Sequence, residues 1–211
     1  MLWLVLLETI QVMATIYMPS SVPNPKVYGE NLYVSNPDGL LSDITVENIN
    51  MMTQRLEQDL DVEMAVVVIG CYDTTKTDIS NFAINLFNRW GIGHSEKNTG
   101  ILVLLVSDTR DIRILTGAGM ENVLTDEMCG KILDDNIPYI VEEGFDSGIM
   151  HIISDIVRIL HSEPAISQLK QINRTAMMSP VIKYAGVIIV IVIITVTVAM
   201  LISKRRRRTR Y

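Results

Sequence analysis

Three oxygen-bearing side chains stand out in two glycine-rich loops of this 211-residue chain. Asn98 ends the segment Gly91–Asn98, and Glu121 and Asp126 lie in the segment Gly117–Asp126. Carboxylate and amide oxygens are the ligands that hard cations such as Ca²⁺ prefer, and glycines let the backbone approach an ion closely. These residues predict a metal site for calcium or another divalent cation. The alternative is that Asp126 only caps a helix and that Glu121 is solvated.

The sequence carries few enzyme signatures. It contains no GxSxG, no HExxH and no Walker phosphate loop. The histidines His94, His151 and His161 are too scattered to predict a metal triad, although His94 lies in a polar loop where it could act as an acid or a base. If the protein is an enzyme, we expect a phosphatase, in which carboxylate-bound metal polarises phosphate oxygens and activates water. The catalytic residues stay unassigned.

The elements that position these loops follow from the hydrophobic periodicities. Continuous β-branched runs predict strands that are buried on both faces, and apolar residues at helical spacing predict helices. The order is α-β-α-β-β-α-α, which indicates an α/β fold with a small mixed sheet sandwiched by helices. We expect helices at 45–60, 78–90, 126–143 and 145–160, and strands at 64–70, 101–106 and 111–116.

Topology sorts the polar loops into two groups. The strand-helix-strand unit makes the first two strands parallel, and the short turn at 108–110 makes the third strand antiparallel to the second. The loops 91–98 and 117–126 are therefore expected to meet at one edge of the sheet. The opposite edge is expected to hold a group with Asp38, Cys71, Asp73, Asp108 and Asp111. Cys129 follows the loop 117–126 and is therefore expected at the edge opposite to Cys71. A disulfide between the two cysteines is not expected, because distant Cα atoms cannot be bridged.

Several phrases in the required order resemble one family. They are YVSNPDGLLSD, AVVVIG, NLFNRWGIGHSEKNTGILVLLVSDTRDIRILTGAGMENVLTD and IPYIVEEGFDSGI, and they extend over Tyr28 to Leu160. Together they resemble the TPM domain family, named after a thylakoid lumen protein, a photosystem II repair protein and a nematode receptor auxiliary protein. A difference is Ala118, where members usually carry an aromatic residue.

The resemblance implies an α/β sandwich in an extracytoplasmic or lumenal location, with a layout similar to that of bacterial membrane-anchored members. It does not imply one reaction. Family members have been described as acid phosphatases, as repair or assembly factors of membrane complexes and as receptor accessories, some with bound calcium.

The C-terminal part of the chain predicts a membrane anchor. The 19 residues 184–202 carry no charge, and as a helix they would extend about 28 Å, close to the thickness of a bilayer core. The basic tail 203–211 follows, and Lys and Arg clusters beside a membrane helix stay in the cytoplasm. We expect the arginines Arg205–Arg208 to contact lipid headgroups, and the preceding domain to be extracytoplasmic.

The remaining segments are assigned by composition. Residues 1–18 are apolar and signal-like, 19–27 are a proline-rich tether, 28–160 form the TPM-like domain and 161–183 are a juxtamembrane linker that we expect to be helical in part. Outside the basic tail the sequence contains 12 Lys and Arg and 24 Asp and Glu, which gives this part a net charge of −12. This charge disfavours nucleic-acid binding and favours cations or basic partners. We expect an accessory or maintenance factor for a membrane protein complex.

Overall fold

A four-stranded mixed sheet with the strand order β2-β3-β5-β6 lies at the centre of the fold. The computed structural model describes residues 15–29 and 31–208, and within the last helix it describes the side chains of 163–176, 190–197 and 199. The chain divides into two compact units, Met1–Ile166 and Ser167–Tyr211. The sheet and the helices around it belong to the first unit.

The sheet confirms the predicted strand directions. The strands are β2 (Val34–Ser35), β3 (Glu63–Ile69), β5 (Gly100–Val106) and β6 (Asp111–Thr116). The first three are parallel, with Glu63 opposite Gly100, and β6 runs antiparallel to β5. Every residue of β3 and β5 is buried, because both faces of these central strands are covered.

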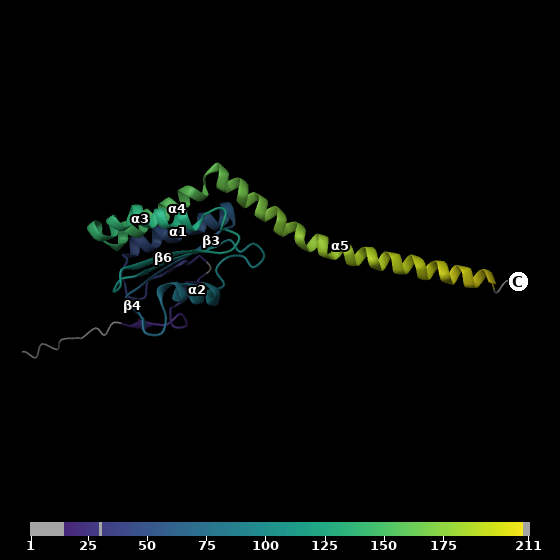
Figure 1. Ribbon diagram of the computed structural model, residues 1–211, viewed down its shortest axis with the longest axis horizontal. Helices are drawn as coiled ribbons and strands as arrows, with labels where there is room; N and C mark the ends of the chain where they lie inside the picture. Colours follow the sequence, from purple (N-terminus) through teal and green to yellow (C-terminus); the bar gives the residue numbers. More distant parts are fainter. Residues whose placement is uncertain (1–14, 30, 209–211) are drawn as a thin grey trace, which may run out of the picture. The chain divides into compact units, whose positions relative to one another are not determined.

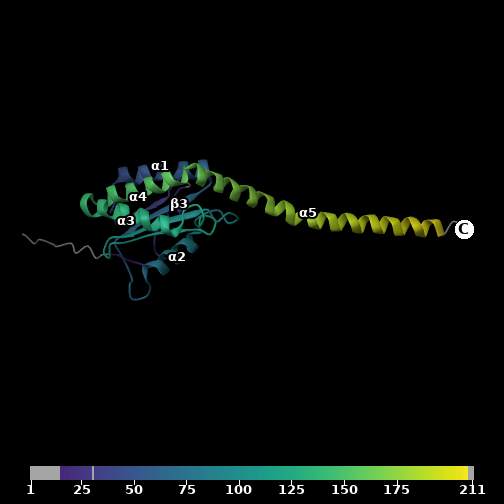
Figure 2. The same cartoon turned by 45° about the horizontal axis from the view of Figure 1, so that its top comes forward.

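Helices cover both faces of the sheet (Figures 1 and 2). On one side lie α1 (Asp43–Leu60), α3 (Asp126–Glu143) and α4 (Phe145–Leu160), and on the other lies α2 (Ile79–Trp90). Side-chain caps at Ser42, Asp78 and Thr125 define where three of these helices begin. The mixed α/β fold is therefore as predicted, and α1 begins two residues before the expected start because Ser42 caps it.

The proline-rich segment 19–27 differs from the expected extended tether. Val22 and Pro25 are buried, and Pro25–Val27 forms a short 3-10 helix capped by Asn24. The apolar contacts of these side chains outweigh the tendency of proline-rich chain to stay extended. Just before it, β1 (Ile16–Tyr17) pairs in parallel with β4 (Cys71–Tyr72) in a second, two-stranded sheet. Of the predicted signal-like segment, residues 1–14 lie outside the described residues.

Helix α5 spans Glu163–Arg208, and its residues from Ser167 onward belong to the second unit. The expected linker 161–183 is thus helical from Glu163 onward. Among the residues whose side chains are described, no helix combines the length and apolar composition needed to cross a membrane. The predicted spanning segment 184–202 includes positions 184–189, 198 and 200–202, whose side chains lie outside that set, so the span stays a prediction.

Candidate functional site

The two glycine-rich loops meet through their backbones at the edge where β3 and β5 begin. The Gly119 N–H donates to the carbonyl oxygen of Asn98 at 3.1 Å, and the Gly117 N–H donates to that of Gly100 at 2.8 Å. A Cβ atom on Gly119 would overlap the carbonyl oxygen of Lys97, so only glycine permits this approach. The prediction that these loops share one edge is confirmed.

The first loop is also fixed to the sheet by a buried carboxylate. Glu63, which is 8% exposed, accepts a hydrogen bond from the Gly93 N–H at 2.9 Å. Its other oxygen lies 2.7 Å from the Lys26 ammonium group. Gly93 has a φ of 96°, a left-handed conformation that favours glycine. The charge of Glu63 is thereby compensated on both oxygens, and the 3-10 helix, the sheet and the loop are held together.

A second polar group extends this edge toward α1. The Tyr33 hydroxyl donates to a carboxylate oxygen of Glu57 at 2.5 Å, and Lys26 lies 5.5 Å from the centre of the Tyr33 ring. Burial, together with the hydrogen bond to Glu57, raises the pKa of Tyr33 well above its usual value. Tyr33 therefore stays protonated and acts as a hydrogen-bond donor at this edge, not as a base.

His94 and Lys97 of the first loop both contact Asp61, the C-cap residue that follows α1. Asp61 has a left-handed backbone with a φ of 59°, and one of its oxygens lies 2.6 Å from Nε2 of His94. Its other oxygen forms an ion pair with Lys97, and its carbonyl oxygen accepts the Thr99 hydroxyl hydrogen bond at 2.8 Å. Sequence reasoning missed Asp61, although an aspartate between a helix and a strand is a recognisable signal for this conformation.

The three predicted metal ligands are exposed residues of the two loops and of the helix start that follows them. Asn98 adopts a left-handed conformation and uses its carbonyl oxygen for the contact with Gly119. Glu121 follows in the second loop, and Asp126 is the first residue of α3. The cap of α3 is Thr125, which accepts from the Met128 N–H at 3.2 Å, so Asp126 does not fill that role. In the described part of the chain, no three His, Cys, Asp or Glu side chains group to hold a metal. The cation site stays a prediction.

The opposite edge of the sheet carries a separate acidic group. Asp38 accepts hydrogen bonds from the Gly70 N–H at 2.7 Å and from the Tyr17 hydroxyl at 3.1 Å, which joins the N-terminal segment to the sheet. Burial and the nearby carboxylate of Asp108 raise the pKa of the Cys71 thiol. Cys71 is therefore not activated as a nucleophile, and both it and Cys129 are free thiols.

The region that forms the sheet and its helices matches a known protein family. The family model of the TPM domain matches residues 34–159, more than half of the chain. The chain belongs to the TPM domain family. This confirms the resemblance found in the sequence, whereas the membrane-anchored subtype stays a prediction.

Two curated rice relatives share the TPM region at low identity. They are chloroplastic UPF0603 proteins of Oryza sativa subspecies indica and japonica, each 22% identical over 114 residues. The match covers 54% of this chain and 38% of each relative, so this TPM protein spans well under half the length of those relatives.

Solved structures share the fold. The N-terminal domain of a protein from P. gingivalis is 28% identical, with a TM-score of 0.63, and the match covers 69% of this chain and 92% of that domain. The BA42 protein of Bizionia argentinensis is 15% identical, with a TM-score of 0.51, and the match covers 59% of this chain and 84% of that protein. The second likeness concerns the fold alone.

Proposed function

We propose that this TPM protein is a membrane-anchored extracytoplasmic domain that assists the assembly or maintenance of a membrane protein complex. The observation that carries the proposal is an apolar stretch of α5. All eight residues from Val190 to Thr197 are exposed, and six of them are valine or isoleucine. A helix that is apolar on every side is stable in a lipid bilayer or in a protein core, and not in water.

The threonines in this stretch fit the same environment. The Thr195 hydroxyl donates to the Val192 carbonyl oxygen at 2.9 Å, and the Thr197 hydroxyl donates to that of Ile193 at 2.9 Å. Their polar groups are thus satisfied inside the helix, as lipid requires. The uncharged sequence 184–202 and the basic residues after it supply the length and the cytoplasmic flank.

The topology is tested by protease treatment of intact spheroplasts that express the full chain with an epitope after the basic tail. Protease should remove the TPM domain and leave a short tagged fragment that contains the membrane helix. If the tag is digested while the domain stays intact, the proposed orientation is wrong. In a separate experiment, a partner complex should co-purify with the full chain from gently solubilised membranes.

Cation binding at the edge with Asn98, Glu121 and Asp126 is part of the proposal. Its support is that loops carrying these oxygen atoms are joined by backbone hydrogen bonds and stay exposed to solvent. Calcium should raise the melting temperature of the full chain, and Asp126→Ala should remove that shift while the secondary structure is unchanged. The same samples test a phosphatase, because metal-dependent hydrolysis of a chromogenic phosphate ester that is lost in Asp126→Ala would favour an enzyme instead.

A further inference from the structure

Helix α3 presents an outward stripe of residues that the fold leaves in solvent. Its buried positions are Cys129, Ile132 and Asn136, which lie on one side of the helix. Most residues on the opposite side are three or four positions apart, which places them on one face of the helix. All are exposed, and they are Glu127, Gly130, Asp134, Ile137, Pro138 and Val141.

The C-terminal half of this stripe is apolar. Ile137 is 43% exposed and Val141 is 67% exposed, one helical turn apart, with Pro138 between them. Pro138 has no N–H group, so the carbonyl oxygen of Asp134 receives no helical hydrogen bond from that position. The stripe therefore combines apolar side chains with a backbone acceptor that receives no helical hydrogen bond from position 138.

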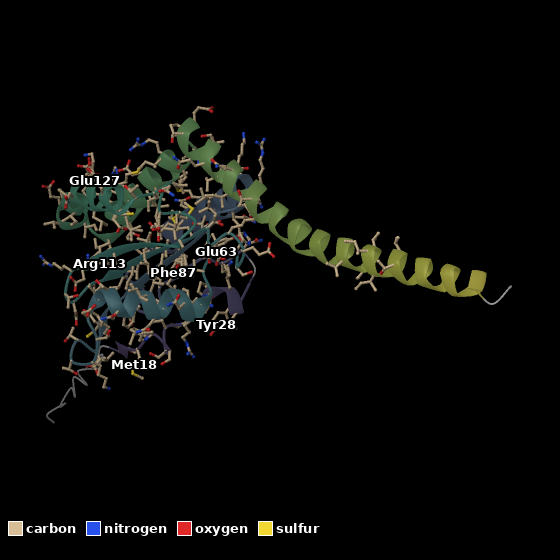
Figure 3. All side chains as sticks on the ribbon, turned by 45° about the vertical axis from the view of Figure 1, so that its right-hand side comes forward. Met18, Tyr28, Glu63, Phe87, Arg113 and Glu127 are labelled. Carbon is tan, nitrogen blue, oxygen red and sulfur yellow. The ribbon has the colours of Figure 1, made fainter. Side chains whose placement is uncertain are left out.

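The rest of α3 is strongly acidic. The helix contains six Asp and Glu residues and one lysine, a net charge of −5 within 18 residues. That lysine, Lys131, pairs with Asp135 at 2.7 Å, which leaves the other carboxylates to dominate the field around the stripe. Figure 3 shows Glu127 on the helical layer, on the side of the sheet opposite to Phe87 of α2.

Contacts between α3 and α4 fix the position of the stripe. Asn136 of α3 donates to the Asp155 carboxylate of α4 at 2.8 Å, and to the carbonyl oxygen of Ile132 at 2.8 Å. A Cβ atom on Gly148 of α4 would lie 2.9 Å from the backbone of Ile140, so the two helices cross at close range. Because the backbone of this surface is already fixed, a partner that binds here loses little free energy to ordering it.

We infer that the outward stripe of α3 binds a basic amphipathic helix of a partner protein, an inference that rests on the proposed role in a membrane complex. Such a helix would place apolar residues on Ile137 and Val141 and lysine or arginine side chains against the flanking carboxylates. A second copy of this chain would oppose one acidic helix to another, and anionic lipid headgroups would be repelled. Charge complementarity therefore selects a basic protein segment.

The test uses the full chain in nanodiscs of phosphatidylcholine, with empty nanodiscs as the background. The probe is a fluorescent 14-residue peptide of leucine and lysine in amphipathic helical order, and a matched peptide carries glutamate in place of lysine. The variant Ile137→Ser/Val141→Ser removes the apolar stripe. The control variant Ile84→Ser changes another residue that is 43% exposed, on α2 and on the other face of the sheet. Fluorescence anisotropy gives the affinities.

We expect the Leu/Lys peptide to bind wild type and the Ile84→Ser variant equally and the double variant about tenfold more weakly. The Leu/Glu peptide should not bind. A second variant, Asp134→Asn/Glu142→Gln, should reduce the salt dependence of binding without changing the apolar stripe, and circular dichroism checks that each variant is folded.

The inference is overturned if the double variant binds like wild type, if both peptides bind alike, or if sedimentation shows a dimer that the double variant dissociates. A failure of the proposed topology is recognised separately, because the protease experiment does not depend on α3.

Discussion

Replacing Gly119 by alanine should separate the two loops of the candidate edge. The new Cβ atom would overlap the carbonyl oxygen of Lys97 and lie 3.1 Å from that of Asn98, and both obstacles are backbone atoms that no rotamer change can move. The loops must therefore part by roughly 1 Å, as in other overpacked sites. This movement would also break the hydrogen bond from the Gly119 N–H to Asn98.

The expected loss of stability follows from these two effects. Overpacking costs about 1–3 kcal/mol, and the lost hydrogen bond costs about 1 kcal/mol. Together they give about 2–4 kcal/mol, which for a unit of this size corresponds to a decrease in melting temperature of roughly 5–15 °C. The melting temperature is measured by circular dichroism on the full chain in detergent, with the first unit giving the cooperative transition.

Gly130→Ala is the matched control. A Cβ atom at this exposed position of α3 meets no atom within 4 Å, so the substitution should stabilise the helix by about 0.5–1 kcal/mol. Opposite signs for the two alanine variants would support the contact between the loops. If Gly119→Ala melts at the same temperature as wild type, the loops do not approach each other as described.

Two further predictions concern buried and partly buried charges. Hydrogen bonds from Arg158 and then Asn136 lower the pKa of Asp155, so its stabilising effect is present above the unfolded pKa of about 4 and is lost as the pH falls through the lower folded value. The urea midpoint should therefore decrease less between pH 6 and pH 3 in Asp155→Asn than in wild type, and an equal decrease would contradict this. Lys26→Met should leave the buried Glu63 carboxylate without its cation and destabilise the first unit by about 1–3 kcal/mol in urea unfolding. Lys26→Arg should recover most of that loss, and a loss of the same size in both variants would show that charge is not the cause.

The central elements could be predicted because their patterns are long. The apolar runs Met64–Ile69 and Ile101–Val106 predict central strands, and the turn after Val106 fixes the direction of β6. The shared edge of the two loops follows from these directions alone. Strands β1, β2 and β4 contain two residues each, which is too short for any periodicity, and they were missed.

The contacts within the candidate site depend on residues that are distant in sequence. Glu63 and Gly93 are 30 positions apart, and Asp61 and Lys97 are 36 positions apart, so their pairing exists only in the folded chain. The burial of Val22 could not be predicted, because the prolines around it are typical of exposed chain. Sequence reasoning therefore located the edge of the sheet but not the polar network that joins it.

Tyr17, near the first described residues, and His161, just before α5, lie at opposite edges of the sheet. Tyr17 bonds to Asp38 at the carboxyl end of β3, whereas His161, just before α5, lies 3.9 Å from Asp59 near its amino end. The two points are separated by the seven residues of β3, about 23 Å at the usual rise of a strand. A pulling force applied between Tyr17 and His161 would thus have a large component along β3, the strand that separates the two points. A connector that joined Tyr17 directly to His161 would need at least seven extended residues.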